Sequence, residues 1–261
     1  MTRDLNEQGR YGTPGAFRRA LTDKLRTSAK SSRWSLQQLQ RLYIEDQGWI
    51  VKGATALLAR DIGVRATIDI DVYRDVAADV AERDLRAAAA RDIGDWFRFE
   101  IGAAHSVTDA DAGVRVPVAA YVGATAWANF HVDLVGGDVR MTGEPDDVPP
   151  LARVAMAQLE QHGYRAYLLV DHIADKVAAT FERYGQTGAP STRYKDLVDI
   201  LAIVIHAPID AEAQARALAS EAQRRQIALP DRFTVPDLGT VGAWLRGGGS
   251  TISAAGGPVS R

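Results

Sequence analysis

Two aspartates interrupt the apolar, β-branched run VRATIDIDVYR at residues 64–74, a pattern that predicts a strand with two different faces. Successive side chains of a strand point to opposite sides, so Asp69 and Asp71 share one face while Ile70 and Val72 point into a core. Their Cα atoms would lie about 6.5 to 7 Å apart, which lets both carboxylates share hard cations. The plain alternative is a half-exposed strand with a wet face, although aspartate is a poor strand former.

A third carboxylate shows the same alternation further along the chain. In FHVDLV, Asp133 shares a face with His131, while Phe130, Val132 and Leu134 point inward. A neighbouring strand could bring Asp133 beside the first two acids and complete a two-metal site. Strand pairing is not visible in the sequence, so this remains a hypothesis. The five histidines show no metal-ligand spacing, and we assign them no chemistry.

The segment KGATALL precedes the acidic strand and combines a glycine turn with the start of a short helix. The N-terminus of a helix attracts anions because its backbone N–H groups are unpaired. A cation site beside a phosphate site is the arrangement that phosphoryl transfer requires. The order of the two segments therefore favours phosphoryl-transfer chemistry.

Two later helices carry charged residues where apolar ones are expected. Lys176 lies at the margin of the apolar stripe of LLVDHIADKVAATFERYG, and Asp199 lies within YKDLVDILAIVIHA, which is apolar on nearly every face. An unpaired buried carboxylate costs several kcal/mol, so we expect Lys176 to pair with Asp199, with Asp196 on the same side of the helix. A purely structural ion pair, or a lysine reaching to water, is the alternative.

The pattern along the chain predicts an α+β protein in four parts. Residues 1–48 form N-terminal helices, one starting at Thr13-Pro14 and one at Ser35, and 49–140 form a core with a mixed sheet. The connector RMTGEPDDVPPLA opens a helical lobe at 141–246, and 247–261 form a flexible Gly/Ser-rich tail. Within the lobe, the expected helices are at about 170–184, 192–206, 210–226 and 236–245.

Composition limits the possible partners and locations. The chain of 261 residues has no cysteine, which excludes disulfides, thiolate zinc sites and a cysteine nucleophile. It shows no signal peptide and no apolar run of about 18 residues, so we expect a cytoplasmic protein without a membrane span. A net charge of −2 means that any nucleic acid must bind a local basic patch. The candidate patch, or else a solvated helix face, comprises Arg18, Arg19, Lys24, Arg26, Lys30 and Arg33.

Three segments together resemble a known family. KGATALLARDIGVRATIDIDVY looks like the first motif of nucleotidyltransferases related to DNA polymerase β, with a glycine turn, a helix and then a strand bearing D-x-D. With DHIADKVAA and RYKDLVDIL, it is similar to the AbiEii/MenT family of bacterial toxin nucleotidyltransferases over roughly residues 48–205. The family's turn is usually a double glycine followed by Ser or Thr, whereas this chain has Gly53-Ala54-Thr55.

The resemblance implies an activity, cofactors and partners. We expect a polymerase β-like nucleotidyltransferase that uses Mg²⁺, or Mn²⁺, to transfer a nucleoside monophosphate from a nucleoside triphosphate to the 3′ end of tRNA. Growth would stop as a result, and a cognate antitoxin protein would be a partner. Transfer to a small molecule or a protein, and a non-catalytic binding module on the same fold, are the alternatives.

The resemblance also implies roles for individual residues. Asp69 and Asp71 would hold the metals, and Asp133 would bind the metal nearer the attacking hydroxyl. Lys176 would offset phosphate charge, and Asp199 would be essential, which is consistent with positioning the lysine rather than touching substrate. The expected substrate-binding residues are Lys52, Gly53, Ala54, Thr55, Arg60, Arg65, Thr67 and Asp196, of which Thr67 matches a hydroxyl position that is linked in the family to modification by the antitoxin.

Overall fold

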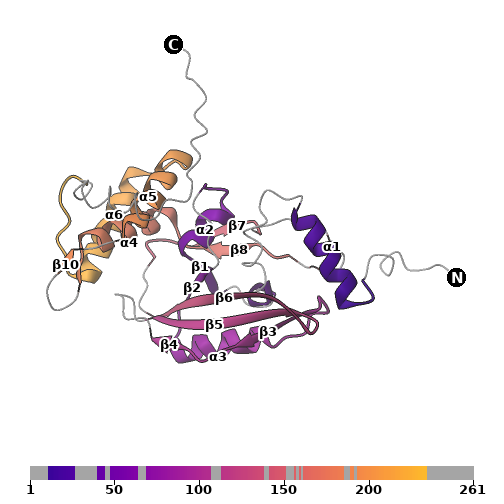
Figure 1. Cartoon of the computed structure of the whole chain (residues 1–261). Helices are drawn as coiled ribbons and strands as arrows, with labels where there is room; N and C mark the ends of the chain where they lie inside the picture. The colour runs from indigo at the N-terminus through magenta and orange to yellow at the C-terminus, as the bar shows by residue number, and fades with distance from the viewer. Residues whose placement is uncertain are drawn as a thin grey trace, which may run out of the picture.

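The computed structural model describes residues 11–26, 40–44, 48–63, 69–106, 113–137, 141–150, 156, 159, 161–184, 189–190 and 193–233. Within these ranges the chain is an α+β protein in which helices cover a mixed sheet (Figure 1). Several predicted features lie outside them: the start of the helix at Ser35, the helix at 236–245, the tail at 247–261, and residues Lys30, Arg33, Arg65 and Thr67.

The main sheet formed by the described residues has eight strands in the order β3-β5-β6-β2-β1-β8-β7, with β4 pairing with β5. It is mixed, as predicted, because β2 pairs with β6 and β1 with β8 in parallel while the other pairs are antiparallel. The strands are β1 Trp49–Val51, β2 Ile70–Arg74, β3 Phe97–Ile101, β4 His105–Ser106, β5 Gly113–Val122, β6 Thr125–Gly136, β7 Asp146–Val148 and β8 Tyr164–Ala166; β9 Arg183–Tyr184 and β10 Ala189–Pro190 form a separate pair.

The connector contains a strand that the sequence pattern did not predict. Strand β7 lies within it, and β8 follows before the first helix of the lobe. Both join the sheet through the parallel pairing of β1 with β8. A division after residue 140 therefore cuts through the sheet. The strand was not predicted because prolines and acids are common in short edge strands as well as in loops.

One face of the sheet is covered by α1 (Pro14–Arg26) and α3 (Ala78–Ala89). The α1 helix begins as predicted, since the N–H of Ala16 donates to the Thr13 hydroxyl at 3.2 Å and Pro14 is the first helical residue. Its Phe17 side chain packs edge-on against Phe97 of β3. The apolar side chains of α1, α3 and the alternate positions of β6 form one core.

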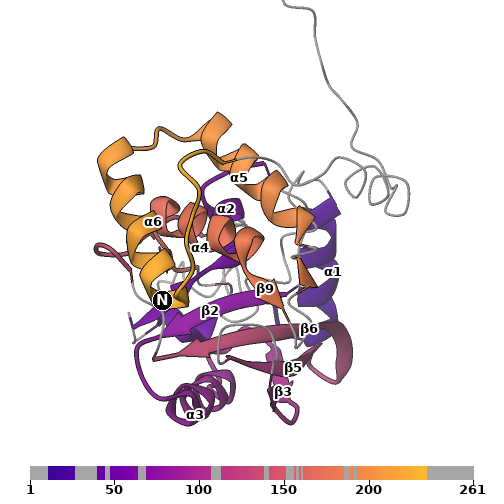
Figure 2. The same cartoon turned by 90° about the vertical axis from the view of Figure 1, so that its left-hand side faces the viewer.

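The other helices lie together beyond the sheet, as Figures 1 and 2 show: α4 (Leu169–Phe181), α5 (Tyr194–His206) and α6 (Ala211–Arg225). The short helix α2 (Gly53–Ala59) joins the two parts, because Leu58 belongs to the sheet core while the adjacent Leu57 packs with Ile173 and Ile203 of the lobe. No described helix is both long and apolar enough to cross a membrane.

Candidate functional site

The three predicted acids meet on neighbouring strands. In the parallel pair of β2 and β6, Asp71 lies directly opposite Asp133, and Asp69 immediately precedes β2. The alternate residues Ile70 and Val72 are buried, as the alternation predicted. Directly opposed residues of paired strands have Cα atoms about 5 Å apart, so their carboxylates interact strongly. The prediction that a neighbouring strand brings Asp133 to the acidic strand is confirmed.

The glycine turn before α2 fits closely around Asp71. Gly53 has φ +57°, and a Cβ atom placed on it would lie 2.0 Å from Oδ2 of Asp71. The N–H of Lys52 donates to the Asp71 carbonyl at 2.8 Å. Thr55 is buried, and its hydroxyl donates to the Asp69 carbonyl at 3.4 Å. The turn thus holds the acidic strand in place, and its contact with a phosphate stays a prediction.

Substituting Gly53 by Ala should therefore destabilise the fold by about 1–3 kcal/mol, because the methyl group adds a steric clash to an unfavourable φ. Urea unfolding followed by circular dichroism measures this change. Gly63→Ala is the control, since a Cβ at Gly63 meets nothing within 4 Å. Equal unfolding midpoints for the two variants would contradict the close approach of Asp71.

Electrostatics at Asp71 reflect its crowded position. Burial, followed by the charge of Asp133, raises the pKa of Asp71 to about 6, with a smaller contribution from Asp69. The ammonium groups of Lys176 and Lys52 act in the opposite direction and lower this pKa. Both lysines are therefore near enough to compensate the acidic cluster. Lys52 is buried, with its Nζ 4.6 Å from the centre of the Tyr167 ring.

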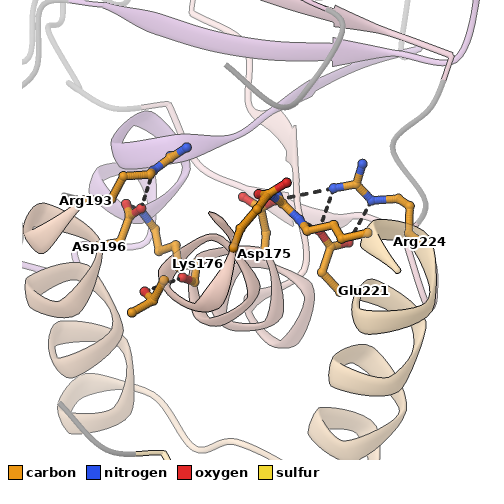
Figure 3. Close-up of polar contacts among 9 residues, drawn as sticks. Asp175, Lys176, Arg193, Asp196, Glu221 and Arg224 are labelled. Atoms are coloured by element: carbon orange, nitrogen blue, oxygen red, sulfur yellow. Dashed lines mark hydrogen bonds and ion pairs between the residues drawn. The ribbon is translucent and has the colours of Figure 1, made fainter. Parts of the chain in front are cut away.

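Lys176 lies between two carboxylates of α5 (Figure 3). Its Nζ donates to Oδ1 of Asp196 at 2.8 Å and to Oδ2 of Asp199 at 2.7 Å, and all three side chains are buried. Arg193 Nε donates to the second oxygen of Asp196 at 2.7 Å. Burial alone would lower the pKa of Lys176, but the two aspartates raise it above its usual value. The predicted pairing of Lys176 with Asp199 and Asp196 is confirmed.

The next residue toward the N-terminus of α4 faces the opposite way. Asp175 points toward α6, where Arg225 Nη2 lies 2.5 Å from its Oδ1 (Figure 3). Arg224 and Arg225 both bond Glu221, which completes a charged cluster between α4 and α6. Although burial opposes it, the charges of Lys52 and Arg225 hold the pKa of Asp175 below its usual value. Sequence reasoning missed this cluster, since its two halves lie far apart in the chain.

Arg60, predicted to lie near the nucleotide, directly follows α2 and makes structural contacts. Arg60 donates from Nη2 to Oδ2 of Asp146 at 2.6 Å and to the carbonyl of Tyr167 at 2.9 Å. It therefore fastens β7 and the start of the lobe to α2, and a contact with nucleotide stays a prediction. Ala54 is buried, and its contact with substrate also stays a prediction.

Two side chains beside the acids were not predicted. Arg115 of β5 binds Asp133 in a bidentate manner, from Nε to Oδ1 at 2.7 Å and from Nη2 to Oδ2 at 2.6 Å. His131, to which no chemistry was assigned, has Nδ1 3.3 Å from Oδ1 of Asp69. Both could have been suspected from strand alternation, because they lie on the polar face of their strands.

Cavities of about 570 and 600 Å³ lie away from these acids, the first between the end of α3 and β3 and the second among α4, α5 and α6. Neither is lined by Asp69, Asp71, Asp133 or Lys176. The candidate site is therefore defined here by its converging charges.

Comparisons with known proteins agree with this geometry. A family model described as "Nucleotidyl transferase AbiEii toxin, Type IV TA system" matches residues 37–242, most of the chain. The chain belongs to the AbiEii family of nucleotidyltransferase toxins. Membership in this type IV toxin–antitoxin family implies a nucleoside triphosphate as substrate and an antitoxin as partner.

The fold of this AbiEii chain is shared with a solved toxin structure. It is similar to MenT4, a nucleotidyltransferase toxin from Mycobacterium tuberculosis H37Rv, with 14% identity over 82% of this chain and 75% of that chain and a TM-score of 0.53. It also matches JHP933 from Helicobacter pylori, with 15% identity over 80% of this chain and 85% of that chain and a TM-score of 0.43. None of the curated proteins compared matches the chain.

Proposed function

We propose that this AbiEii chain is an Mg²⁺-dependent enzyme that transfers a nucleoside monophosphate to the 3′ end of tRNA in the cytoplasm and thereby arrests growth. The observation that carries the proposal is the register of β2 and β6, which sets Asp71 against Asp133 with Asp69 beside them. Lys176 and Lys52 lie near enough to lower the pKa of Asp71. Carboxylates that can bind a divalent cation, next to lysines that can bind phosphate, suit the transfer of a nucleoside monophosphate from a triphosphate.

The donor set fits a hard divalent cation, since carboxylate oxygens are the ligands that Mg²⁺ and Mn²⁺ prefer. Asp69, Asp71 and Asp133 would hold it. As the side chains stand, no group of three His, Asp or Glu among the described residues is arranged to bind one metal ion. Both oxygens of Asp133 are bonded to Arg115, whose positive charge would compete with the cation. When bound, the cation would activate the acceptor hydroxyl and neutralise phosphate charge.

The chain's own residues would supply positioning and charge. The acceptor oxygen forms a bond to the α-phosphorus, the bond from that phosphorus to the β-phosphate bridging oxygen breaks, and pyrophosphate leaves with the electron pair. The hydroxyl proton passes to Asp133. Lys176, kept cationic by Asp196 and Asp199, faces the negative charge of the triphosphate, and the backbone of Gly53 to Thr55 approaches its phosphates.

A basic helix face supports a polynucleotide as the acceptor. In α1, Arg18, Arg19 and Lys24 are exposed while Phe17 and Leu21 are buried in the sheet core. Exposed cations on a rigid helix can follow a phosphate backbone. This face would hold the body of the tRNA while its 3′ end reaches the acids.

The test supplies the purified full-length chain and Mg²⁺ with each of the four α-³²P-labelled nucleoside triphosphates in turn. Parallel reactions contain total tRNA, cell protein or a metabolite extract. We expect label on tRNA, and none on tRNA whose 3′ terminal ribose has been oxidised by periodate. Label on protein or metabolites alone would reject tRNA as the acceptor. Absence of label in every reaction, with expression in cells causing no arrest, would reject catalysis.

A further inference from the structure

One row of charged side chains crosses three neighbouring strands of the sheet. Arg115 of β5 is the direct cross-strand partner of Asp133 of β6, and Asp133 is the direct partner of Asp71 of β2. Partners in register point to the same face of a sheet. The row therefore has the guanidinium of Arg115 at one end, Asp133 in the middle and Asp71 at the other end.

Arg115 takes up both oxygens of Asp133. Its Nε and Nη2 lie 2.7 and 2.6 Å from Oδ1 and Oδ2 respectively, which is the strong, parallel form of the arginine–carboxylate bond. A divalent cation at Asp133 needs at least one of these oxygens and would bring a second positive charge against the guanidinium. The Arg115 bond therefore weakens the binding of a cation at Asp133, because both draw on the charge of the same carboxylate.

The ion pair between Arg115 and Asp133 is partly exposed to solvent, so it can open. The Arg115 side chain is 45% exposed and that of Asp133 is 23% exposed, so water can solvate both groups when they separate. The pair Arg41–Asp95 contrasts with it, because those side chains are 1% and 6% exposed and cannot separate without burying bare charges. The hydrogen bonds to Asp133 raise the pKa of Arg115, to which Asp69 and Asp71 also contribute, so its guanidinium compensates all three acids.

We propose that Arg115 is a positioning residue that competes with the divalent cation for Asp133 and so sets the affinity of the acidic site for that cation. While the bond is made, Arg115 holds the third carboxylate in register and reduces the repulsion between Asp133 and Asp71. When the bond opens, Asp133 becomes available as a ligand. This inference rests on the proposed metal site, but it concerns a residue that the proposed reaction does not use.

The test measures binding of Mn²⁺ to the full-length chain by the loss of the free-ion electron paramagnetic resonance signal, without nucleotide. We expect Arg115→Met to bind Mn²⁺ about three- to tenfold more tightly than the wild type, because the competing charge is gone. Arg115→Lys, which cannot form the bidentate bond, should lie between them. Arg98→Met is the matched control, as Arg98 is another strand arginine paired with a carboxylate, Glu100, and should change the affinity less than twofold.

A double-variant cycle separates competition for Asp133 from a general charge effect. In an Asp133→Asn background, Arg115→Met should gain less than twofold. Equal or weaker Mn²⁺ binding by both Arg115 variants, or the same gain with and without Asp133, would overturn the proposal. Asp71→Asn reports on the metal site itself. If it binds Mn²⁺ as the wild type does, both the metal site and the role of Arg115 fail; if it loses binding while Arg115→Met gains nothing, only the role of Arg115 fails.

Discussion

Replacing Asp71 by Asn should reduce nucleotidyl transfer by on the order of a thousandfold while leaving the fold intact. Asp71 is the acid that contacts the glycine turn and faces Asp133, so it lies at the centre of the proposed metal site. Asparagine keeps the volume of the side chain but removes the charge that a cation requires. Initial rates of label transfer to tRNA, measured at saturating nucleotide, check this. Full activity in the variant would remove Asp71 from the reaction.

The same variant should become more stable than the wild type at neutral pH when both are measured with a chelator. The folded pKa of Asp71, about 6, lies above its usual value of 3.8, so ionisation of this group opposes folding. The penalty is absent below about pH 4 and grows until the pH passes 6. Urea unfolding of both proteins from pH 4 to 8 should show a difference that rises to at most about 3 kcal/mol. A variant less stable than the wild type at pH 7.5 would indicate a structural role for the charge.

Replacing Lys176 by Met should abolish transfer and also destabilise the chain by about 3–5 kcal/mol. The substitution leaves Asp199 buried without its cation, and Asp196 would retain only Arg193. A loss of that size is a large share of the 5–15 kcal/mol that stabilises a typical domain. Urea unfolding midpoints and the tRNA labelling rate give the two effects separately.

A second substitution distinguishes the structural from the catalytic part of this loss. Lys176→Met combined with Asp199→Asn removes the uncompensated charge and should recover most of the stability. Activity should stay absent, because the ammonium group of Lys176 then no longer faces the triphosphate. If activity returned with stability, Lys176 would serve only to balance Asp199. Lys195→Met is the control, since Lys195 is an exposed lysine of α5 and should leave both measurements near those of the wild type.

The acidic face could be predicted because successive side chains of a strand point to opposite faces of the sheet. Asp69, Asp71 and Asp133 each stand between apolar residues, so their side chains had to lie on the polar side of a sheet. What the sequence could not supply is the register that sets Asp71 against Asp133, because β3, β4 and β5 lie between the two strands in the chain. Parallel pairing over such a separation depends on the whole sheet.

The lysine pair could be predicted for a different reason, which is the free energy of a buried charge. Asp199 lies in an apolar helix, and this required a cation from another element. The same argument did not reveal how much of that helix is exposed: Leu201 and Ile205 are 59% and 65% exposed, although their sequence context is apolar throughout. Arg115 was missed because a charged residue on the polar face of a strand requires no partner.

The two adjacent leucines of α2 tie the separate halves of the site to one short piece of chain. Leu57 packs with the lobe that carries Lys176, and Leu58 with the sheet that carries the acids, immediately after the turn that encloses Asp71. Because α2 packs against both parts, its position helps to set the spacing between the ammonium group and the carboxylates. A change in the size of Leu57 or Leu58 should therefore alter the distance between Lys176 and the acids, although neither leucine contacts them through a polar group.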